Sequence, residues 1–227
     1  MRNMSVLGTL DAALTYILSH FDTFLTLLRE HLALVLVSVV LAIVVAIPLG
    51  VLATRNKQVK RVVMSVGNVA QTVPTLAIIA LVFPLLGLGF LPSLVGLFTY
   101  ALLPILTNTV AGLEDVDEST VAAARGMGMT ENQILRKIKL PLALPVIFAG
   151  IRTSAVLNVG TAYLAFFIGG GGLGVWVITG ISLFDTPQLL AGAIPGALLA
   201  IGLDLLFALI ERRLGTNSAQ TQTIATG

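Results

Sequence analysis

Between Arg61 and Glu114 the chain reads VVMSVGNVAQTVPTLAIIALVFPLLGLGFLPSLVGLFTYALLPILTNTVAGL (residues 62–113), without one charged side chain. A single helix of this length would measure about 78 Å at 1.5 Å per residue, whereas the hydrocarbon core of a membrane is about 30 Å thick. The stretch therefore predicts two membrane spans, near 62–86 and 92–113, with a turn at 87–92.

The rest of the chain repeats this pattern. Three more stretches carry no charge, at residues 32–54, 153–184 and 186–203. Only 11% of the 227 residues are charged and 56% are hydrophobic, whereas a soluble domain carries about 25% charged residues. This composition excludes a water-soluble globular domain and predicts an all-α, polytopic membrane protein with about five core transmembrane helices. The remaining three spans are expected near 31–53, 142–168 and 189–210.

The two ends of the chain differ from this core. In residues 1–30, apolar side chains recur at helical spacing but are interrupted by Asp11, His20 and Asp22, which predicts an outer amphipathic segment that lies on the membrane. The core domain is expected to cover residues 31–213. Residues 214–227 are mostly Thr, Gln, Ala, Asn and Ser, a composition typical of a disordered tail.

The distribution of basic residues predicts the orientation. Lys and Arg collect in the cytoplasmic segments of membrane proteins, and ten of the thirteen fall on one side of a five-span arrangement. We therefore expect the N-terminus outside the cell and the C-terminus in the cytoplasm. The ten residues are Arg55, Lys57, Lys60, Arg61, Arg125, Arg136, Lys137, Lys139, Arg212 and Arg213.

Residues 114–141 form the one long polar stretch, and they are predicted to be a cytoplasmic loop. Acidic residues at its start suit a short helix over 115–125, because negative charge stabilises a helix N-terminus. Thr130 and Gln133 match a capping box that begins a second helix. Pro141 is expected to end that second helix and to open the next one.

Two ionisable residues lie inside predicted spans. Arg152 and Asp204 are each about 10–15 Å from the cytoplasmic edge. Because a charge in lipid costs at least a few kcal/mol, it usually has a partner. We expect the two side chains to pair across helices or to face an aqueous cavity, with a structural ion pair favoured over a contact with substrate.

Uncharged polar side chains also occur within the spans. They could line a polar passage built from three helices, or they could serve only to pack the helices together. Pro74 lies beside the first of them, and a proline inside a membrane helix leaves a carbonyl without its usual donor. The candidates are Asn68, Gln71, Thr72, Asn108, Asn158 and Thr161.

No catalytic or metal-binding constellation is expected. His20 and His31 have no carboxylate pair or cysteine nearby, and the chain contains no cysteine at all, so we interpret both histidines as interfacial polar residues. The run GGGGLG at 169–174 has the spacing of the GxGxxG nucleotide motif. That motif requires a strand before it, whereas here a membrane helix precedes the run, which predicts a flexible break between helices.

The polar loop carries a more specific pattern. From Ala122 the sequence reads Ala-Ala-Ala, three residues, Gly128, nine residues, and then Ile138-Lys139-Leu140-Pro141. This resembles the EAA loop of ABC importer permeases, E-A-A-x3-G-x9-I-x-L-P, with Ala122 in place of the glutamate. The resemblance implies that the helix around Val121 to Gly128 is a coupling helix that docks on an ATPase subunit. The residues so implicated are Val121, Ala122, Ala123, Ala124, Gly128, Ile138, Leu140 and Pro141.

Longer blocks resemble the permeases of osmoprotectant importers, at residues 31–55, 67–89, 103–153 and 167–174. The resemblance implies a MetI-like type I ABC importer permease fold in a prokaryotic plasma or inner membrane. It also implies a second permease subunit, separate ATPases that bind ATP and Mg, and an extracytoplasmic substrate-binding protein, with no cofactor in this chain, no enzyme activity of its own and no nucleic-acid partner. The implied solutes are glycine betaine, carnitine and choline, moved by alternating access.

Other functions stay open at this point. The chain could serve an importer of another solute, such as methionine or phosphonate. An ion-coupled secondary transporter would be expected to show internal repeats and a midplane carboxylate, and a non-transporting scaffold would make the EAA-like loop a coincidence. The sequence shows no cluster of aromatic residues of the kind that holds quaternary ammonium groups, so we expect the binding protein to select the solute.

Overall fold

The computed structural model describes residues 6–225, and within them every regular element is a helix, as predicted. The described residues form ten α-helices, and the last of them runs toward the C-terminus. The α-helices are α1 (Val6–Ser19), α2 (Phe21–Arg55), α3 (Lys57–Thr72), α4 (Thr75–Leu86), α5 (Phe90–Glu114), α6 (Glu118–Gly126), α7 (Glu131–Ile134), α8 (Leu140–Thr161), α9 (Gly174–Leu183) and α10 (Thr186–Ala225).

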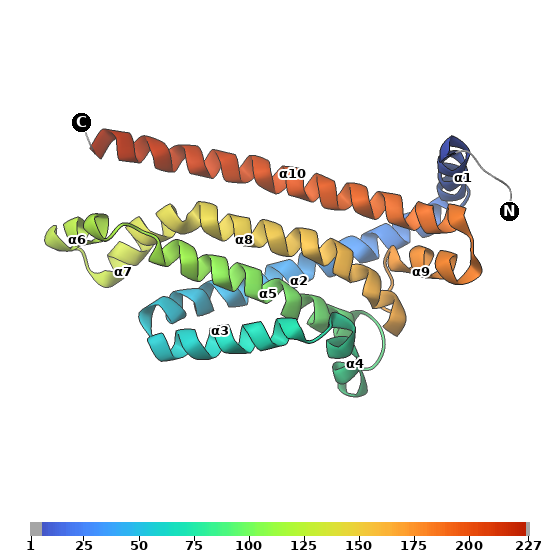
Figure 1. The fold of residues 1–227 in the computed structure, drawn as a ribbon, viewed down its shortest axis with the longest axis horizontal. Coiled ribbons are helices and arrows are strands. Elements are labelled where there is room, and N and C mark those ends of the chain that lie inside the picture. Colours follow the sequence, from blue (N-terminus) through green and yellow to red (C-terminus); the bar gives the residue numbers. More distant parts are fainter. Residues whose placement is uncertain (1–5, 226–227) are drawn as a thin grey trace.

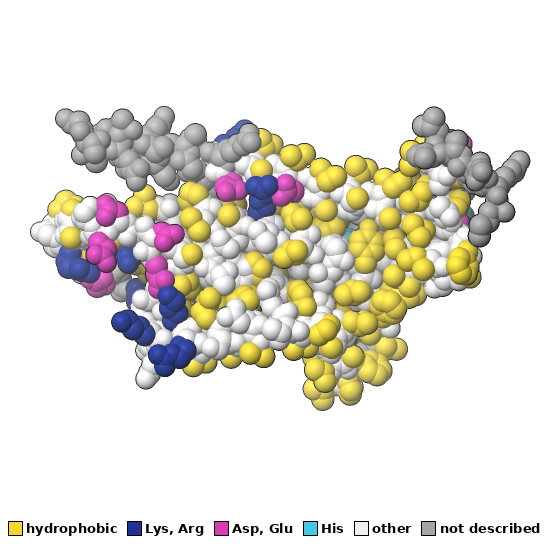
Figure 2. Space-filling model, viewed as in Figure 1, with side chains coloured by type: hydrophobic (Ala, Val, Ile, Leu, Met, Phe, Trp, Pro, Cys, Tyr) yellow, Lys and Arg dark blue, Asp and Glu magenta, His cyan; other side chains and the backbone are white. Residues whose placement is uncertain are grey.

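The long helices α2, α5, α8 and α10 run lengthwise through the molecule (Figure 1). Helix α5 packs against both α2 and α8, and α10 packs along α8. Helices α6 and α7 form one end of the bundle, where charged side chains gather (Figure 2). We call this the basic end, after Arg55, Lys57, Lys60 and Arg61 at the turn between α2 and α3. Helices α1 and α9 lie at the opposite, far end (Figure 1).

The number of spans agrees with the sequence, but one span has a different form. Four helical segments are long and apolar enough to cross a membrane, and the pair α3–α4 brings the number to five if it counts as one span. That pair is bent by 98°, so the span predicted over 62–86 is broken rather than continuous. Helix α4 leaves the bundle sideways (Figure 1).

Pro74 causes the bend. The residue before a proline avoids the helical conformation, and Val73 is accordingly extended, with φ −81° and ψ 124°. The carbonyl of Val73 accepts a hydrogen bond of 2.9 Å from the Tyr100 hydroxyl. A side chain of α5 therefore satisfies the backbone group that the break leaves open, as a membrane interior requires.

The first span begins ten residues earlier than expected. Helix α2 starts at Phe21 and crosses residues 30 and 31 without a break, so the predicted boundary between an amphipathic segment 1–30 and the core is corrected to the turn at His20. Glu30 lies within this helix, and its carboxylate accepts a hydrogen bond of 2.9 Å from the Gly172 amide. Residues 1–5 of that predicted segment lie outside the described residues.

Pro141 lies in the first turn of α8, as the sequence predicts, but the backbone before it stays helical. The chain is helical from Glu131 to Ile168, and residues Leu135–Lys139 form a π-helical turn in which the Leu140 amide donates to the Leu135 carbonyl. A proline ring collides with the carbonyl four residues before it in an α-helix, and the wider π turn gives that carbonyl room. The predicted capping box of Thr130 and Gln133 is confirmed.

Helix α10 also continues further than the sequence indicated. Its backbone is helical to Ala225, and the disorder of residues 214–227 stays a prediction. Extending an existing helix needs no new nucleation, and no proline follows Pro195 to stop it. Residues 226–227 lie outside the described part.

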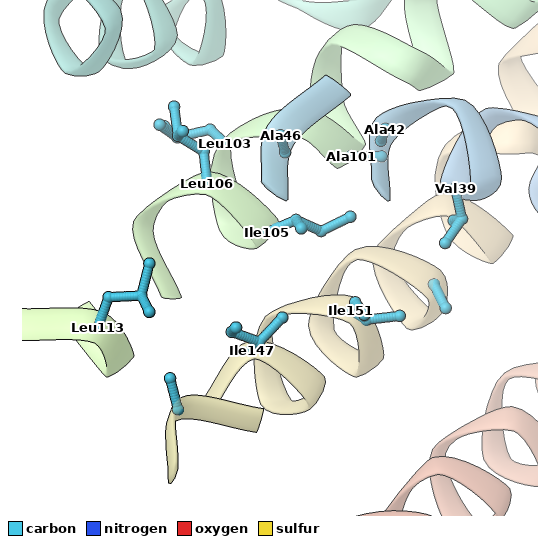
Figure 3. Packing of buried hydrophobic residues seen from close by; sticks show 12 residues of the cluster. Val39, Ala42, Ala46, Ala101, Leu103, Ile105, Leu106, Leu113, Ile147 and Ile151 are labelled. Carbon is cyan, nitrogen blue, oxygen red and sulfur yellow. The ribbon is translucent and has the colours of Figure 1, made fainter. Parts of the chain in front are cut away.

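The main core lies between α2, α5 and α8 (Figure 3). Small side chains such as Ala42, Ala46 and Ala101 let the helix backbones approach one another, as is typical of membrane bundles. Helices α8 and α5 approach closely at Gly150, where an added Cβ would lie 2.7 Å from the Pro104 carbonyl oxygen of α5. Any larger residue there must push α8 and α5 apart.

Candidate coupling helix and intramembrane ion pair

Helix α6 begins at Glu118, next to the acidic residues that predicted the start of a helix. The Asp117 carboxylate accepts a 3.0 Å hydrogen bond from the Ser119 amide and a second one from the Ser119 hydroxyl. These hydrogen bonds stabilise the charged carboxylate, so they hold the pKa of Asp117 below its ordinary value. The cap is therefore fully charged at neutral pH.

We predict that this cap is lost in acid. Because the pKa of Asp117 is lower in the folded chain than in the unfolded one, its stabilising contribution is complete above the ordinary aspartate pKa and disappears as the pH falls through the lowered value. Asp117→Ala should speed amide hydrogen exchange at Ser119 and Thr120 at pH 7, whereas Asp117→Asn keeps an acceptor and should have a smaller effect. Equal exchange in Asp117→Ala and the parent protein would contradict the assignment.

The two faces of α6 differ. Ala124 is 1% exposed and holds the helix against the bundle, whereas Ala122 and Ala123 are exposed, and Val121 is half-buried. Met127 follows the helix with 75% of its surface exposed. A small-residue face beside an exposed flexible apolar side chain, outside the apolar part of the molecule, is typical of a docking surface.

Gly128 turns the chain after α6. Its φ is +81°, a left-handed conformation that costs other residues roughly 1–2 kcal/mol. The Gly128 amide donates to the Arg125 carbonyl at 3.0 Å and the Met129 amide to the Ala124 carbonyl at 3.2 Å. The EAA-like glycine is therefore the residue that lets the chain reverse and enter α7.

The end of the EAA-like pattern joins this loop to a membrane helix. Ile138 and Leu140 are half-buried and Pro141 is exposed. Leu135 and Leu140 pack against the main core, and Ile134 just before them is 1% exposed. The loop that carries α6 is thus joined to α8 by packed apolar side chains.

Two of the polar residues predicted to line a passage make hydrogen bonds between helices. Asn158 is buried and donates to Ser38 Oγ at 2.8 Å and to the Leu97 carbonyl at 3.2 Å. It therefore joins α8 to α2 and α5, in agreement with the packing alternative. Gln71 of α3 donates to the Tyr100 carbonyl at 3.4 Å.

The other four passage candidates are spread over three helices. Asn108 is half-buried and donates to the Pro104 carbonyl of its own helix at 2.8 Å. Thr161 likewise donates to a carbonyl of its own helix. Asn68 and Thr72 are exposed on α3, so the lining role remains a prediction for these residues.

The structure brings Arg152 and Asp204 together. Arg152 Nε lies 2.7 Å from Asp204 Oδ1, and Arg152 Nη2 lies 2.9 Å from Oδ2, a two-pronged pairing between α8 and α10. Glu211 lies further along α10, and its Oε2 is 3.3 Å from Arg152 Nη1. The contact of Glu211 with this pair was not predicted, because Glu211 marked the expected end of the last span.

A double-mutant cycle tests this pairing. Arg152→Ala leaves two carboxylates without their cation, and Asp204→Ala leaves the guanidinium without its main partner, so each single change should lower the melting temperature of the permease. The double variant should be no less stable than the worse single variant, because it removes both charges together. Fully additive losses would show that the two residues act independently.

The contacts of the glycine run at the far end were not predicted from the sequence. Residues 169–174 connect the 3₁₀ helix Ala162–Ile168 to α9, and they rest against α2 through Glu30. His31 is not interfacial as expected but fully buried, and its Nε2 donates to the Val159 carbonyl at 3.0 Å. His20 is exposed.

Aromatic side chains at the far end pack against one another, although not as an open cage of the kind that holds a quaternary ammonium group. Tyr16 stacks on His20 with ring centroids 4.5 Å apart and contacts Trp176 edge-on at 5.2 Å, and Phe24 stacks on Trp176 at 6.0 Å. Trp176 is 3% exposed, so this cluster is packed rather than open. Aromatic residues at this position are typical of a membrane interface.

These features together define a polytopic membrane protein that presents a docking helix at its basic end. The family profile described as "Binding-protein-dependent transport system inner membrane component" matches residues 42–216. The chain belongs to this family. It is therefore a permease component, not itself an enzyme, and the family implies an ATPase and a substrate-binding protein as partners.

Related proteins agree with this membership. The chain is 45% identical over 185 residues to the choline transport system permease protein OpuBB of Bacillus subtilis, covering 82% of this chain and 85% of that one. It is 41% identical over 211 residues to the glycine betaine/carnitine/choline transport system permease protein OpuCB of the same organism, covering 93% and 97%. The osmoprotectant import permease protein OsmY of Salmonella typhimurium is 45% identical over 192 residues, covering 84% and 81%.

Solved structures show the same fold. An inward-facing MetNI methionine ABC transporter chain superposes with a TM-score of 0.79 at 23% identity, covering 86% of this chain and 98% of that one. A chain of an amino acid ABC transporter gives a TM-score of 0.69 at 20% identity, covering 88% and 97%. The predicted MetI-like permease fold is thereby confirmed.

Proposed function

We propose that this chain is the permease subunit of an ABC importer for a quaternary ammonium osmoprotectant, namely glycine betaine, carnitine or choline. The observation that carries the proposal is the exposed helix α6, held by buried Ala124 and closed by Gly128 at φ +81°, in a chain 41–45% identical to permeases named for these solutes. Transport proceeds by alternating access, driven by a separate ATPase.

Helix α6 is the contact with that ATPase. ATP and Mg bind to the ATPase, and movement of its surface displaces α6. The packed connection through Ile134, Leu135 and Leu140 passes this movement to α8. A second permease subunit, either another copy or a paralogue, completes the pathway, and an extracytoplasmic binding protein delivers the solute at the far end.

The same proposal fixes the orientation in a prokaryotic plasma or inner membrane. The basic end carries Arg55, Lys57 and Arg61 together with α6, so it faces the cytoplasm. The N-terminus is then outside and α10 ends inside. The far end, with Trp176 and Tyr16, lies at the outer interface.

An uptake panel tests the solute class. The chain, its ATPase and its binding protein are reconstituted in proteoliposomes containing ATP, and uptake of labelled choline, glycine betaine and carnitine is compared with uptake of methionine and a phosphonate. We expect uptake of at least one quaternary ammonium solute and none of the other two. Uptake of methionine or phosphonate alone would retain the ABC permease and reject the osmoprotectant. Uptake without the ATPase would indicate a secondary transporter.

A further inference from the structure

An apolar groove lies between α2, α8 and α10. Its volume is about 180 Å³, and all ten side chains that line it are apolar, five from α2, three from α8 and two from α10. Leu36 and Val40 of α2 are 49% and 55% exposed, whereas Ile151 and Ala155 of α8 are 6% and 3% exposed. The groove therefore has an open mouth beside α2 and a buried floor on α8.

Neither water nor a whole polar solute suits this groove. A cavity of about 150 Å³ lined by Leu, Ile and Phe stays dry and takes up small apolar molecules. Small-molecule sites typically measure about 300–1,000 Å³ and contain a few polar groups, whereas this groove is smaller and is lined by no polar side chain. An empty groove would leave its wall atoms without dispersion contacts. The occupant that fits is narrow and apolar.

The length and depth of the groove match one leaflet of a membrane. On α2 the groove extends from Val35 to Ile43, which is about 12 Å at 1.5 Å per residue. One leaflet contributes about 15 Å of a hydrocarbon core about 30 Å thick. These residues lie in the half of the uncharged stretch 32–54 that is nearer the far end, and this end faces outward in the proposed orientation. The groove is therefore at the depth of the acyl chains of the outer leaflet.

The surface of α2 around the mouth has the composition of a surface that faces lipid. Every exposed side chain of residues 32–54 is apolar, and most of them are large. Helix contacts within membranes are enriched in small residues and in residues with a hydroxyl group. On α2 such residues, among them Ser38, Ala42 and Ala46, are buried inside the bundle. The exposed face of α2 thus favours lipid over a second permease subunit.

We propose that the groove between α2, α8 and α10 holds one acyl chain of an outer-leaflet phospholipid. The acyl chain enters between Leu36 and Val40 and reaches Ile151 and Ala155, where it supplies the dispersion contacts that an empty groove lacks. Lipid that only touches the outer surface of α2 is different, because none of it lies inside the protein. The lipid in the groove is part of the packing of α10 on the bundle, whichever solute the importer carries.

Photolabelling tests the identity of the occupant. The importer is assembled with its ATPase and binding protein in liposomes of phosphatidylethanolamine and phosphatidylglycerol. A small fraction of phosphatidylcholine in these liposomes carries a trifluoromethylphenyl diazirine at the end of one acyl chain. Illumination converts the diazirine into a carbene that inserts into nearby C–H bonds, and mass spectrometry of the digested permease identifies the labelled residues.

We expect label on α8 at Ile151 or Ala155 as well as on the exposed face of α2. Val40→Trp should block the mouth and lower the labelling of α8 at least about fivefold, because overpacking costs about 1–3 kcal/mol. Leu41→Trp is the matched control, since Leu41 is 41% exposed at the same depth but lies outside the groove, about 100° further around the helix. It should leave the labelling of α8 unchanged. Both positions are exposed, so neither indole removes an internal contact.

Three results would overturn the proposal. Label on α2 alone would mean that lipid touches only the outer surface of the permease. No label on either helix would mean that protein covers the groove. An equal effect of Val40→Trp and Leu41→Trp on the labelling of α8 would mean that the diazirine reaches α8 by another route. Solute uptake is not measured in this experiment, so each of these results would leave the proposed function standing.

Discussion

Ala123→Trp is expected to abolish most ATP-driven uptake while leaving the permease folded. Ala123 is exposed on α6, so an indole at this position removes no internal contact. At a close-packed docking surface, however, the extra volume costs roughly 1–3 kcal/mol, which weakens ATPase binding by about fivefold to 150-fold. The measurements are co-purification of the ATPase and the rate of solute uptake in proteoliposomes.

The matched control for this variant is Gln58→Trp. Gln58 is also exposed at the basic end, in the first turn of α3, but it lies outside the EAA-like loop. The same indole there should leave ATPase binding and uptake near the parent values. Equal losses in both variants, or normal ATPase binding in Ala123→Trp, would show that α6 is not the docking helix.

Gly150→Leu is expected to destabilise the whole bundle. A Cβ at Gly150 already lies 2.7 Å from the Pro104 carbonyl oxygen and from Asn108 Cβ, and the carbonyl cannot move without moving α5. Helix propensity opposes this effect, since replacing glycine gains up to about 1 kcal/mol in a helix. Overpacking costs about 1–3 kcal/mol and more where backbone is displaced, so the steric effect prevails.

Gly160→Leu provides the comparison on the same helix. An added Cβ at Gly160 meets nothing within 4 Å, so only the favourable change in helix propensity remains. The melting temperature of the purified permease should fall by about 5 °C or more in Gly150→Leu and should stay level or rise in Gly160→Leu. A similar shift in both variants would refute the close approach of α5 and α8.

Charge-free length was sufficient to predict some elements closely. Helix α5 was expected over 92–113 and runs from Phe90 to Glu114, because a glycine- and proline-rich turn marks one end and the first charge marks the other. The short helix before Arg125 was predicted from its acidic start in the same way. In these cases the signal that ends the element lies within the element itself or beside it.

The errors share a physical cause, which is a partner distant in sequence. The 98° bend after α3 depends on Pro74 but also on the Tyr100 hydroxyl, which satisfies the Val73 carbonyl from another helix. The burial of His31, which was expected at an interface, involves the Val159 carbonyl of another helix. A local sequence pattern shows that such a residue is unusual within its helix. It does not show which distant residue contacts it.

The same distinction applies to the site. The EAA-like pattern could be recognised because it is contiguous from Val121 to Pro141, and Arg152 and Asp204 stood out as isolated charges in apolar spans. Glu211 did not, because a charge at the end of a span is ordinary. The aromatic cluster was missed because Tyr16 and Trp176 meet only through tertiary packing.

Solute-stimulated ATP hydrolysis tests the central claim most directly. The chain is reconstituted in liposomes with its ATPase and binding protein, and hydrolysis is measured with glycine betaine, carnitine, choline or methionine. We predict stimulation by at least one quaternary ammonium solute, and loss of that stimulation in Gly128→Leu, whose side chain is strained at φ +81°. Stimulation by methionine alone, or no stimulation from a fully assembled complex, would contradict the account.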